Sequence, residues 1–191
     1  MRSRCYPSGS SPSAAAAWQR DLRADLFRLL GLEDLVAAAI PLHPEASETE
    51  EFDGYYRFEA TLSSTTTRRL VATLTLPDSS RTQSVPAVVC IHGHEDTSAS
   101  VYEDDSIYKG FAGALAGRGV ATIAVDVGQH EVYDPGRLLM GERLWDLMRC
   151  VDYLEAMPKV DTGRIGCAGL SLGGEMAMWL GAMDERIAAE F

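Results

Sequence analysis

The chain has 191 residues, of which 46% are hydrophobic, so it is long enough for one domain with a buried core. Its 17 basic and 28 acidic residues give a formal net charge of −11, which repels phosphate backbones and argues against nucleic acid as a partner. The longest apolar runs have the length of a strand, far short of the ~20 residues that a membrane span needs, so we expect no membrane association.

The N-terminal quarter predicts a tail, a helix and a loop. Residues 1–13 are rich in Ser, Pro and Gly and predict a disordered tail. Residues 14–54 predict a helix and an acidic loop, because Trp18 and Leu22 begin a run at helical spacing and Gly31 can end it. The alanine patch is too short for the core of a signal peptide and the four cysteines form no C-x-x-C motif, which favours a cytoplasmic location.

The remaining residues, 55–191, predict an α/β domain with a mostly parallel sheet, antiparallel N-terminal strands and helices on both faces. Two runs of alternating polarity indicate an antiparallel pair with one face in water. Three later runs are apolar throughout, as parallel strands covered on both faces require, and helical spacing separates them. The alternating runs are 55–62 and 69–76, the apolar runs are 87–91, 120–125 and 164–169, and the helical stretches are 105–118 and 137–157.

A serine turn follows the last apolar run. Gly169-Leu170-Ser171-Leu172-Gly173 matches G-x-S-x-G between a predicted strand and a predicted helix, which is how several enzymes present a nucleophilic serine. Side chains at either glycine would collide with the neighbouring strand and helix. In this hypothesis Ser171 is the nucleophile and the Leu172 N–H faces the oxyanion that forms during the reaction.

A second loop, in "VVCIHGHEDT", follows the first predicted parallel strand. An oxyanion donor is expected there, and the main-chain N–H of His94, or alternatively of Gly93, is the candidate. We expect His92 to brace the loop. His130 and Asp126, in the loop after the next strand, are candidates for the pocket wall, and Asp126 equally suits a structural hydrogen bond.

These segments resemble the α/β-hydrolase superfamily, and more narrowly its dienelactone hydrolase and acetyl xylan esterase-like branch. The resemblance rests on "AVVCIHGH", "GVATIAVDVG" and the stretch that runs from "LWDLMRCVDYL" through "GCAGLSLGGEM" to "RIAA". It implies an eight-stranded, mostly parallel sheet and a Ser-Asp-His triad. It also implies hydrolysis of a small carboxylic ester through an acyl-enzyme, without a cofactor.

Ser171 lacks its expected partners in this sequence. The family order is serine, acid, histidine, but no histidine follows Ser171, so we expect both groups beyond Phe191 and a domain truncated before its last strands. Truncation would leave an open sheet edge that favours self-association. Alternatively, His130 substitutes as the base. Glu175 lies in the first turn after the serine, where a carboxylate suits the helix dipole or lies on the substrate side.

Two other interpretations of the chain's function stay open. The spacing His92-x-His94-x-Asp96 resembles a metal motif of metal-dependent hydrolases, with His130 or Asp126 as further ligands. A non-catalytic remnant of the fold that binds a ligand or partner is the third class. Asp146 and Arg149, three apart on a predicted helix, are expected to form a solvated ion pair.

Overall fold

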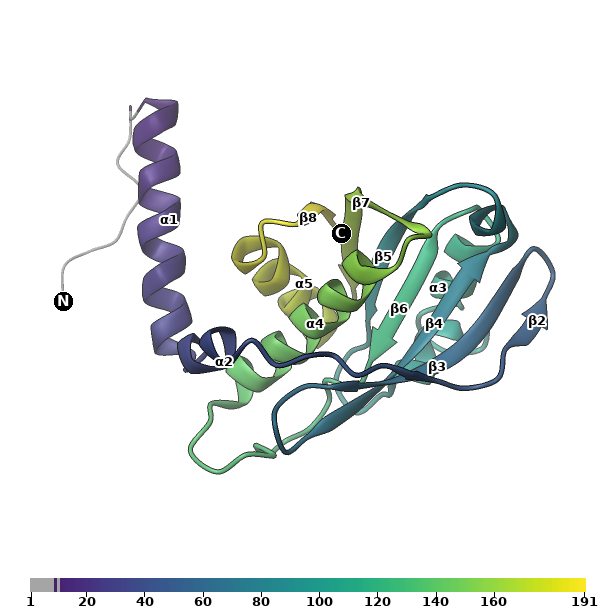
Figure 1. Ribbon diagram of the computed structural model, residues 1–191, viewed down its shortest axis with the longest axis horizontal. Coiled ribbons are helices and arrows are strands. Elements are labelled where there is room, and N and C mark those ends of the chain that lie inside the picture. Colours follow the sequence, from purple (N-terminus) through teal and green to yellow (C-terminus); the bar gives the residue numbers. More distant parts are fainter. Residues whose placement is uncertain (1–8, 10) are drawn as a thin grey trace.

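The computed structural model describes residue 9 and residues 11–191. The chain forms one mixed sheet with helices packed on it (Figure 1). Its strands lie in the order β1-β3-β4-β6-β5-β7-β8, and β2 pairs with β3 beside this path. The strands are β1 (Glu45–Ala46), β2 (Glu50–Phe52), β3 (Tyr55–Ser63), β4 (Arg69–Pro77), β5 (Val85–Ile91), β6 (Ala121–Val125), β7 (Val160–Gly169) and β8 (Ile187–Glu190). The helices are α1 (Pro12–Leu29), α2 (Glu33–Ala38), α3 (Phe111–Ala116), α4 (Leu139–Ala156) and α5 (Leu172–Met183), with 3-10 turns η1 (Asp78–Arg81) and η2 (Ser98–Tyr102).

The sheet has a parallel half and an antiparallel half. Strands β6, β5, β7 and β8 are parallel, whereas β3 and β4 form an antiparallel pair that joins the parallel half where β4 meets β6. The alternating residues of β3 and β4 place one face in the core and leave the other partly in water, as their polarity predicts. The predicted fold class is confirmed.

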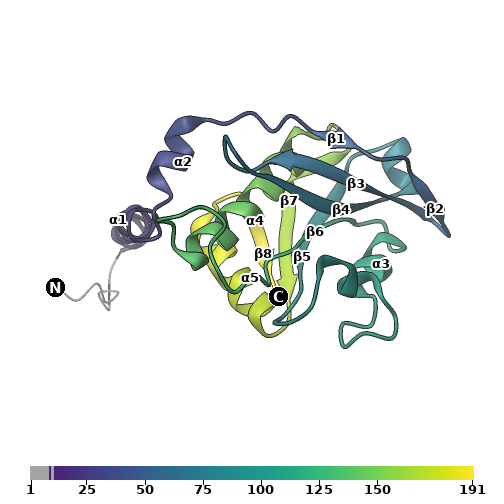
Figure 2. The same cartoon turned by 90° about the horizontal axis from the view of Figure 1, so that it is seen from below.

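Helices cover both faces of the parallel half (Figure 2). Val89 and Ile91 of β5 face the large core under α4 and α5, while Val88 and Cys90 face a smaller cluster under α3. Because successive side chains of a strand point to opposite faces, a strand that is apolar throughout can be buried on both sides. This arrangement places the carboxyl ends of β5, β6 and β7 at one edge of the sheet.

The predicted helix over 105–118 is wrong for its first half, because α3 begins only at Phe111. Lys109 and Gly110 have φ values of 53° and 57°, which a right-handed helix cannot accommodate. The Ser106 hydroxyl donates to a carbonyl of η2 at 2.7 Å and holds the preceding residues in turns. Ile107, which fits the helical spacing, is therefore 65% exposed.

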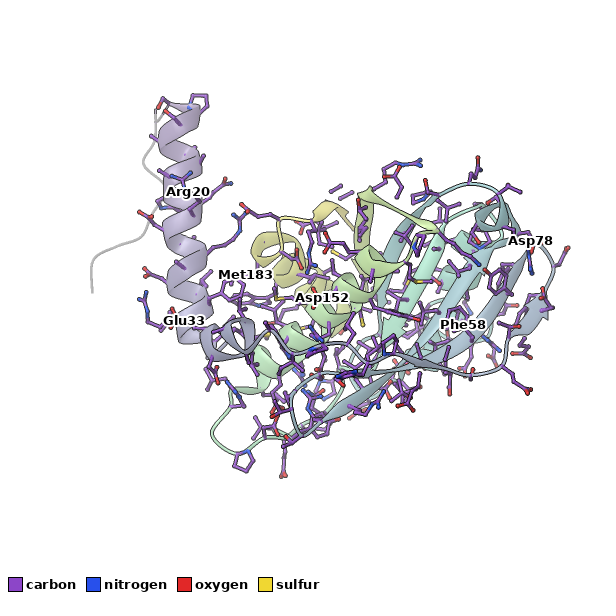
Figure 3. All side chains as sticks on the ribbon, in the orientation of Figure 1. Arg20, Glu33, Phe58, Asp78, Asp152 and Met183 are labelled. Atoms are coloured by element: carbon purple, nitrogen blue, oxygen red, sulfur yellow. The ribbon has the colours of Figure 1, made fainter. Side chains whose placement is uncertain are left out.

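Helix α1 begins at Pro12, two residues before the expected start, where the Ser11 hydroxyl caps it. It extends away from the sheet in Figure 1, and Figure 3 shows Arg20 on this projecting helix, whereas Glu33 lies at its foot, where α2 begins. Arg23 ties it to the end of α5 by donating to the Ala182 carbonyl at 2.7 Å. Residues 1–8 and 10 of the expected tail lie outside the described residues. Within the described part of the chain, no helix combines the length and the apolar character that crossing a membrane requires.

The predicted solvated pair of Asp146 and Arg149 is wrong, since both side chains are buried. Asp146 receives two hydrogen bonds from Arg68, at 2.7 and 2.9 Å, and one from the Ser64 hydroxyl at 2.5 Å. Arg149 pairs with Asp152 at 2.7 Å. The turn between β3 and β4 folds over α4 and supplies partners that helical spacing cannot reveal.

We expect Asp146→Ala to lower the free energy of unfolding by about 3 kcal/mol, because the largely buried Arg68 guanidinium loses the carboxylate to which it donates two hydrogen bonds. Asp34→Ala is the matched control. Asp34 also binds an arginine, Arg137, through both oxygens, but its side chain is 66% exposed, so we expect a loss of about 1 kcal/mol or less. Urea unfolding of the two variants measures the difference, and equal losses would contradict it.

Strand β8 ends the sheet, and of the described strands it pairs with β7 alone. Three of its four residues are exposed. An unpaired strand edge attracts other strands, so the chain is predicted to self-associate through β8. Sedimentation velocity over a range of concentrations checks this, and a monomer at all concentrations would contradict it.

Candidate active site

Ser171 occupies a sharp turn between a strand and a helix. Strand β7 ends at Gly169 and α5 begins at Leu172, with Ser171 between them at φ 59° and ψ −122°. Holding the backbone of a residue other than glycine at such angles costs about 1–3 kcal/mol, and this strain is typical of functional sites. The residue is exposed at the sheet edge, so the position predicted for the nucleophile has the geometry of a nucleophile turn.

Two glycines make this turn possible. An ideal Cβ on Gly169 would lie 2.4 Å from the backbone of Gly173, at the start of α5. An ideal Cβ on Gly173 would lie 2.2 Å from the Ile91 carbonyl oxygen and 2.8 Å from that of His92. The helix therefore packs directly on the end of β5, and the expected collision of larger residues at both positions is confirmed.

Two main-chain N–H groups near Ser171 in the chain or in space are the candidates for an oxyanion site. Within the described residues, the N–H groups of Leu172 and His94 have no hydrogen-bond partner. The Gly93 N–H, the alternative candidate, donates to the Tyr108 hydroxyl at 2.5 Å and is therefore occupied. An ideal Cβ on Gly93 would lie 3.3 Å from the Cβ of Ser171, so the loop after β5 passes close to the serine.

His92 braces this loop. Its ring is fully buried, with Nδ1 2.8 Å from the Gly93 carbonyl and Nε2 3.0 Å from the Val127 N–H. Because the carbonyl only accepts and the N–H only donates, Nδ1 carries the hydrogen. Asp126 accepts from the Ser98 N–H at 2.5 Å and has the structural hydrogen bond that its alternative interpretation assigned to it.

Tyr108 and Asp96 form a pair that the sequence analysis did not identify. The Tyr108 hydroxyl donates to Asp96 at 2.8 Å and accepts from the Gly93 N–H. Burial and the bond to Asp96 raise the pKa of the Tyr108 phenol, so it stays protonated. Its oxygen lies 2.8 Å from an ideal Cβ on Gly93, so Tyr108 and Ser171 flank the same glycine. The acidic stretch "YEDDS" (102–106) could have indicated that the predicted helix does not begin before Tyr108, so that Tyr108 lies in a loop.

His130 lies against His94 rather than in contact with the serine. The two rings have centroids 4.8 Å apart and planes tilted by 51°. In the described part of the chain, no hydrogen bond joins His130 to Ser171. Both histidines are exposed at the carboxyl-end edge of the sheet, so His130 is part of the surroundings of the site.

The metal-binding alternative does not fit the geometry. Both ring nitrogens of His92 are engaged within the protein, and Asp96 accepts from Tyr108. No group of three or more potential ligands that could hold a metal ion is formed among residues 9 and 11–191. The spacing of His92, His94 and Asp96 therefore reflects a braced loop.

Glu175 lies one turn into α5. Its N–H donates to the Ser171 carbonyl at 3.1 Å, and its side chain is exposed. Burial lowers the pKa of Arg143 on α4, and the Glu175 carboxylate acts against this shift, which links Glu175 electrostatically to the neighbouring helix. The position suits both roles considered for Glu175, at the helix N-terminus and on the substrate side.

Comparisons with known proteins place this geometry in context. A family model described as "Glucuronyl esterase, fungi" matches residues 60–190. YtaP of Bacillus subtilis, which carries the name of a hydrolase, is 38% identical over 52 residues, equal to 27% of this chain and 17% of that protein. The chain thus spans only a fraction of this relative's length.

Several solved esterase structures share the fold. A Bacteroides fragilis protein named as an acetyl xylan esterase has a TM-score of 0.81 at 19% identity, over 98% of this chain and 55% of its own. Acetyl xylan esterase 1 of a Thermoanaerobacterium species scores 0.68 at 16% identity, over 90% of this chain and 56% of its own. A glucuronoyl esterase of Solibacter usitatus scores 0.59 at 19% identity, over 78% and 50%. These likenesses establish the α/β-hydrolase fold, and the chain spans about half the length of each protein. Because the family model matches more than half of the chain, the chain belongs to the glucuronyl esterase family.

Proposed function

We propose that the chain provides the nucleophile and the oxyanion-binding amides of a serine-dependent hydrolase of carboxylic esters. The observation that carries this proposal is the backbone of Ser171, held at φ 59° in an exposed turn beside the loop of Gly93. Membership of the glucuronyl esterase family and the esterase names of the structural neighbours support an ester as the substrate.

In the proposed reaction, Ser171 Oγ attacks the acyl carbon while its proton passes to a base. The carbonyl oxygen becomes an oxyanion that accepts from the Leu172 and His94 N–H groups, each worth roughly 3–4 kcal/mol of transition-state stabilisation. The tetrahedral intermediate collapses, the C–O bond to the alcohol breaks and the base returns the proton to that alcohol. Water then attacks the acyl-enzyme by the same route and releases the acid.

Proton transfer needs a base and an acid in addition to these groups. Among the described residues, no imidazole or carboxylate bonds to Ser171 Oγ. The proposal therefore requires a histidine and an acid that lie outside those residues, in the order serine, acid, histidine that is typical of the fold. His130 remains the alternative base, since it lies at the same edge of the sheet and contacts His94.

The substrate proposed is an ester of a carbohydrate. The neighbours are named for acetyl xylan and for glucuronoyl esters, and each of these names contains a carbohydrate. The exposed position of Ser171 suits a large substrate that approaches the sheet edge from solvent.

A fluorophosphonate probe tests the proposal. We expect it to form one adduct on Ser171 in the protein that carries this chain, located by mass spectrometry of the digested protein. The Ser171 hydroxyl has no hydrogen bond among the described residues, and this favours one other candidate, a non-catalytic remnant of the fold that binds a ligand. A protein that binds carbohydrate but forms no adduct would support this candidate and contradict the hydrolase.

We expect Tyr108→Phe to lower kcat about tenfold with little change in KM, because it leaves the Gly93 N–H unpaired and loosens the loop that positions His94. The variant keeps the aromatic packing, so steady-state kinetics on an aryl ester isolates the hydroxyl.

Tyr102→Phe is the matched control for Tyr108→Phe. The Tyr102 hydroxyl donates to the Thr73 carbonyl at 3.0 Å, in the same apolar cluster but on the side of β4. We expect lower stability and unchanged kcat. Equal kinetic losses in the two variants would contradict a positioning role for Tyr108.

A further inference from the structure

A groove opens at the amino-terminal ends of the parallel strands, at the opposite edge of the sheet from Ser171, and is called the distal groove below. Lys159 lines it and directly precedes Val160, the first residue of β7, whereas Ser171 lies just beyond the last residue of that strand. Strand β5 pairs with β7 along its 7 residues, which rise about 3.3 Å each, so roughly 20 Å of sheet separates the two places. The distal groove is therefore distinct from the candidate active site.

The walls of the distal groove are mainly apolar and are held in place by the sheet. Its volume is about 380 Å³, within the range of small-molecule sites. Buried core residues form one wall, namely Tyr56 and Phe58 of β3 and Leu76 of β4, and Phe58 is labelled in Figure 3. The opposite wall is tied to β3, because the Ser47 N–H donates to the Glu59 carbonyl at 2.9 Å and the Ser47 hydroxyl accepts from the Glu59 N–H at 3.0 Å.

Two cations flank the ring of Tyr56, and their partners differ. The Arg81 guanidinium lies 4.6 Å from the ring centroid and the Lys159 ammonium 5.4 Å from it. Arg81 also pairs with the carboxylates of Glu51 at 3.1 Å and Asp78 at 3.4 Å. Lys159 Nζ donates to the Tyr56 hydroxyl at 2.8 Å, but no carboxylate of the described residues lies within ion-pair distance of it. On a chain with a net charge of −11, this ammonium is a local attraction for an anion beside an apolar groove.

Tyr153, in the last turn of α4, adds a second donor to the distal groove. Its side chain is half-buried, and its hydroxyl makes no hydrogen bond within the part of the chain that the structure describes. Burial raises the pKa of this phenol, so it stays protonated and can donate. The groove thus combines apolar walls with one ammonium and one neutral hydroxyl that are both available to a ligand.

We infer that the distal groove binds a small arylalkanoate, a monocarboxylate with an aromatic body. The carboxylate accepts from the Lys159 ammonium and the Tyr153 hydroxyl, and the ligand ring packs against Tyr56 and Phe58. One carboxylate suits two donors, whereas a phosphate dianion would bring more charge than they satisfy against apolar walls. The inference is independent of the proposed hydrolase, because no step of that reaction involves this edge of the sheet.

Isothermal titration calorimetry of the intact chain with sodium phenylbutyrate tests the distal groove. We expect a dissociation constant of about 1 mM or lower, which a ligand of this size reaches at an ordinary binding efficiency per atom. Phenylbutyramide has the same shape without the charge, and butyrate has the charge without the ring. Both should bind at least about tenfold more weakly, because each lacks one of the two interactions.

Variants separate the charge from the apolar walls. Lys159→Met keeps the apolar stem of the side chain, so it should weaken phenylbutyrate about tenfold and leave the affinity for phenylbutyramide unchanged. Lys109→Met removes the other lysine of the chain, which is exposed, and should bind both ligands normally. Tyr153→Phe removes the second donor and should weaken phenylbutyrate by about 3- to 10-fold. Urea unfolding of each variant checks that it is folded.

Three results would overturn the inference. The first is no detectable binding of phenylbutyrate, and the second is equal affinity for phenylbutyrate and phenylbutyramide. The third is an affinity for phenylbutyrate that stays the same in Lys159→Met or that is lost in Ser171→Ala, because the ligand would then lie elsewhere. Ser171→Ala is expected to bind phenylbutyrate normally, so failure of the distal groove and failure of the proposed hydrolase are separate results.

Discussion

Replacing Ser171 with alanine is expected to lower kcat by about 10⁴–10⁶-fold on an activated aryl ester, in the protein that carries this chain. The nucleophilic oxygen is lost, while the oxyanion-binding amides remain and account for the residual rate. Within the described residues Ser171 Oγ makes no hydrogen bond, so the free energy of unfolding should change by no more than about 0.5 kcal/mol.

Ser79→Ala is the control for this variant. Ser79 lies in η1 (Asp78–Arg81), near the opposite end of the strands, and its replacement makes the same chemical change. Steady-state kinetics should show unchanged activity for Ser79→Ala. If Ser171→Ala kept more than a tenth of the original kcat, Ser171 would not be the nucleophile.

Replacing Gly173 with alanine is expected to lower the free energy of unfolding by about 3 kcal/mol or more. The new Cβ would lie 2.2 Å from the Ile91 carbonyl oxygen, which belongs to the backbone at the end of β5. This strand pairs with both β6 and β7, so it cannot move aside without loss of sheet hydrogen bonds.

Gly174 provides a matched control on the same helix. An ideal Cβ there would lie 3.4 Å from the nearest atom, the Gly169 carbonyl oxygen, which is ordinary contact. Because alanine has a higher helix propensity than glycine, Gly174→Ala should leave the free energy of unfolding unchanged or raise it by up to about 1 kcal/mol. Urea unfolding of both variants measures the contrast, and a similar loss in both would contradict the packing of α5 on β5.

The strands were predictable because their pattern reflects burial. Val88 and Cys90 alternate with Val89 and Ile91, and all are apolar, since helices cover both sides of β5. On β3 and β4 one face is partly wet, and polar residues alternate there instead. Local composition thus records which faces of the sheet are covered.

The first half of the helix predicted over 105–118 failed for a backbone reason. Spacing alone placed Ile107 in phase with Phe111, but left-handed angles at Lys109 and Gly110 break the segment between them. Lysine has no special preference for such angles, so Gly110 alone indicated a break in the helix. The hydroxyl of Ser106 completes the turn through a contact outside any periodic pattern.

The part of the candidate site that is formed by one continuous segment could be predicted from the sequence. The contacts between separate loops could not. The glycines around Ser171 follow from local steric demands, so the turn could be read from five consecutive residues. The bond from Tyr108 to Asp96 and the burial of Arg143, whose Nη2 donates to the Gln129 carbonyl, depend on which loops pack together. In the sequence, Arg143 is an ordinary polar residue of a helix.

The most direct measurement of the central claim is mass spectrometry of the protein quenched during turnover of an aryl ester. The account predicts an acyl group attached to the peptide that contains Ser171, and none in Ser171→Ala. Hydrolysis at full rate with no acyl group on that peptide, or with the group on another residue, would contradict it.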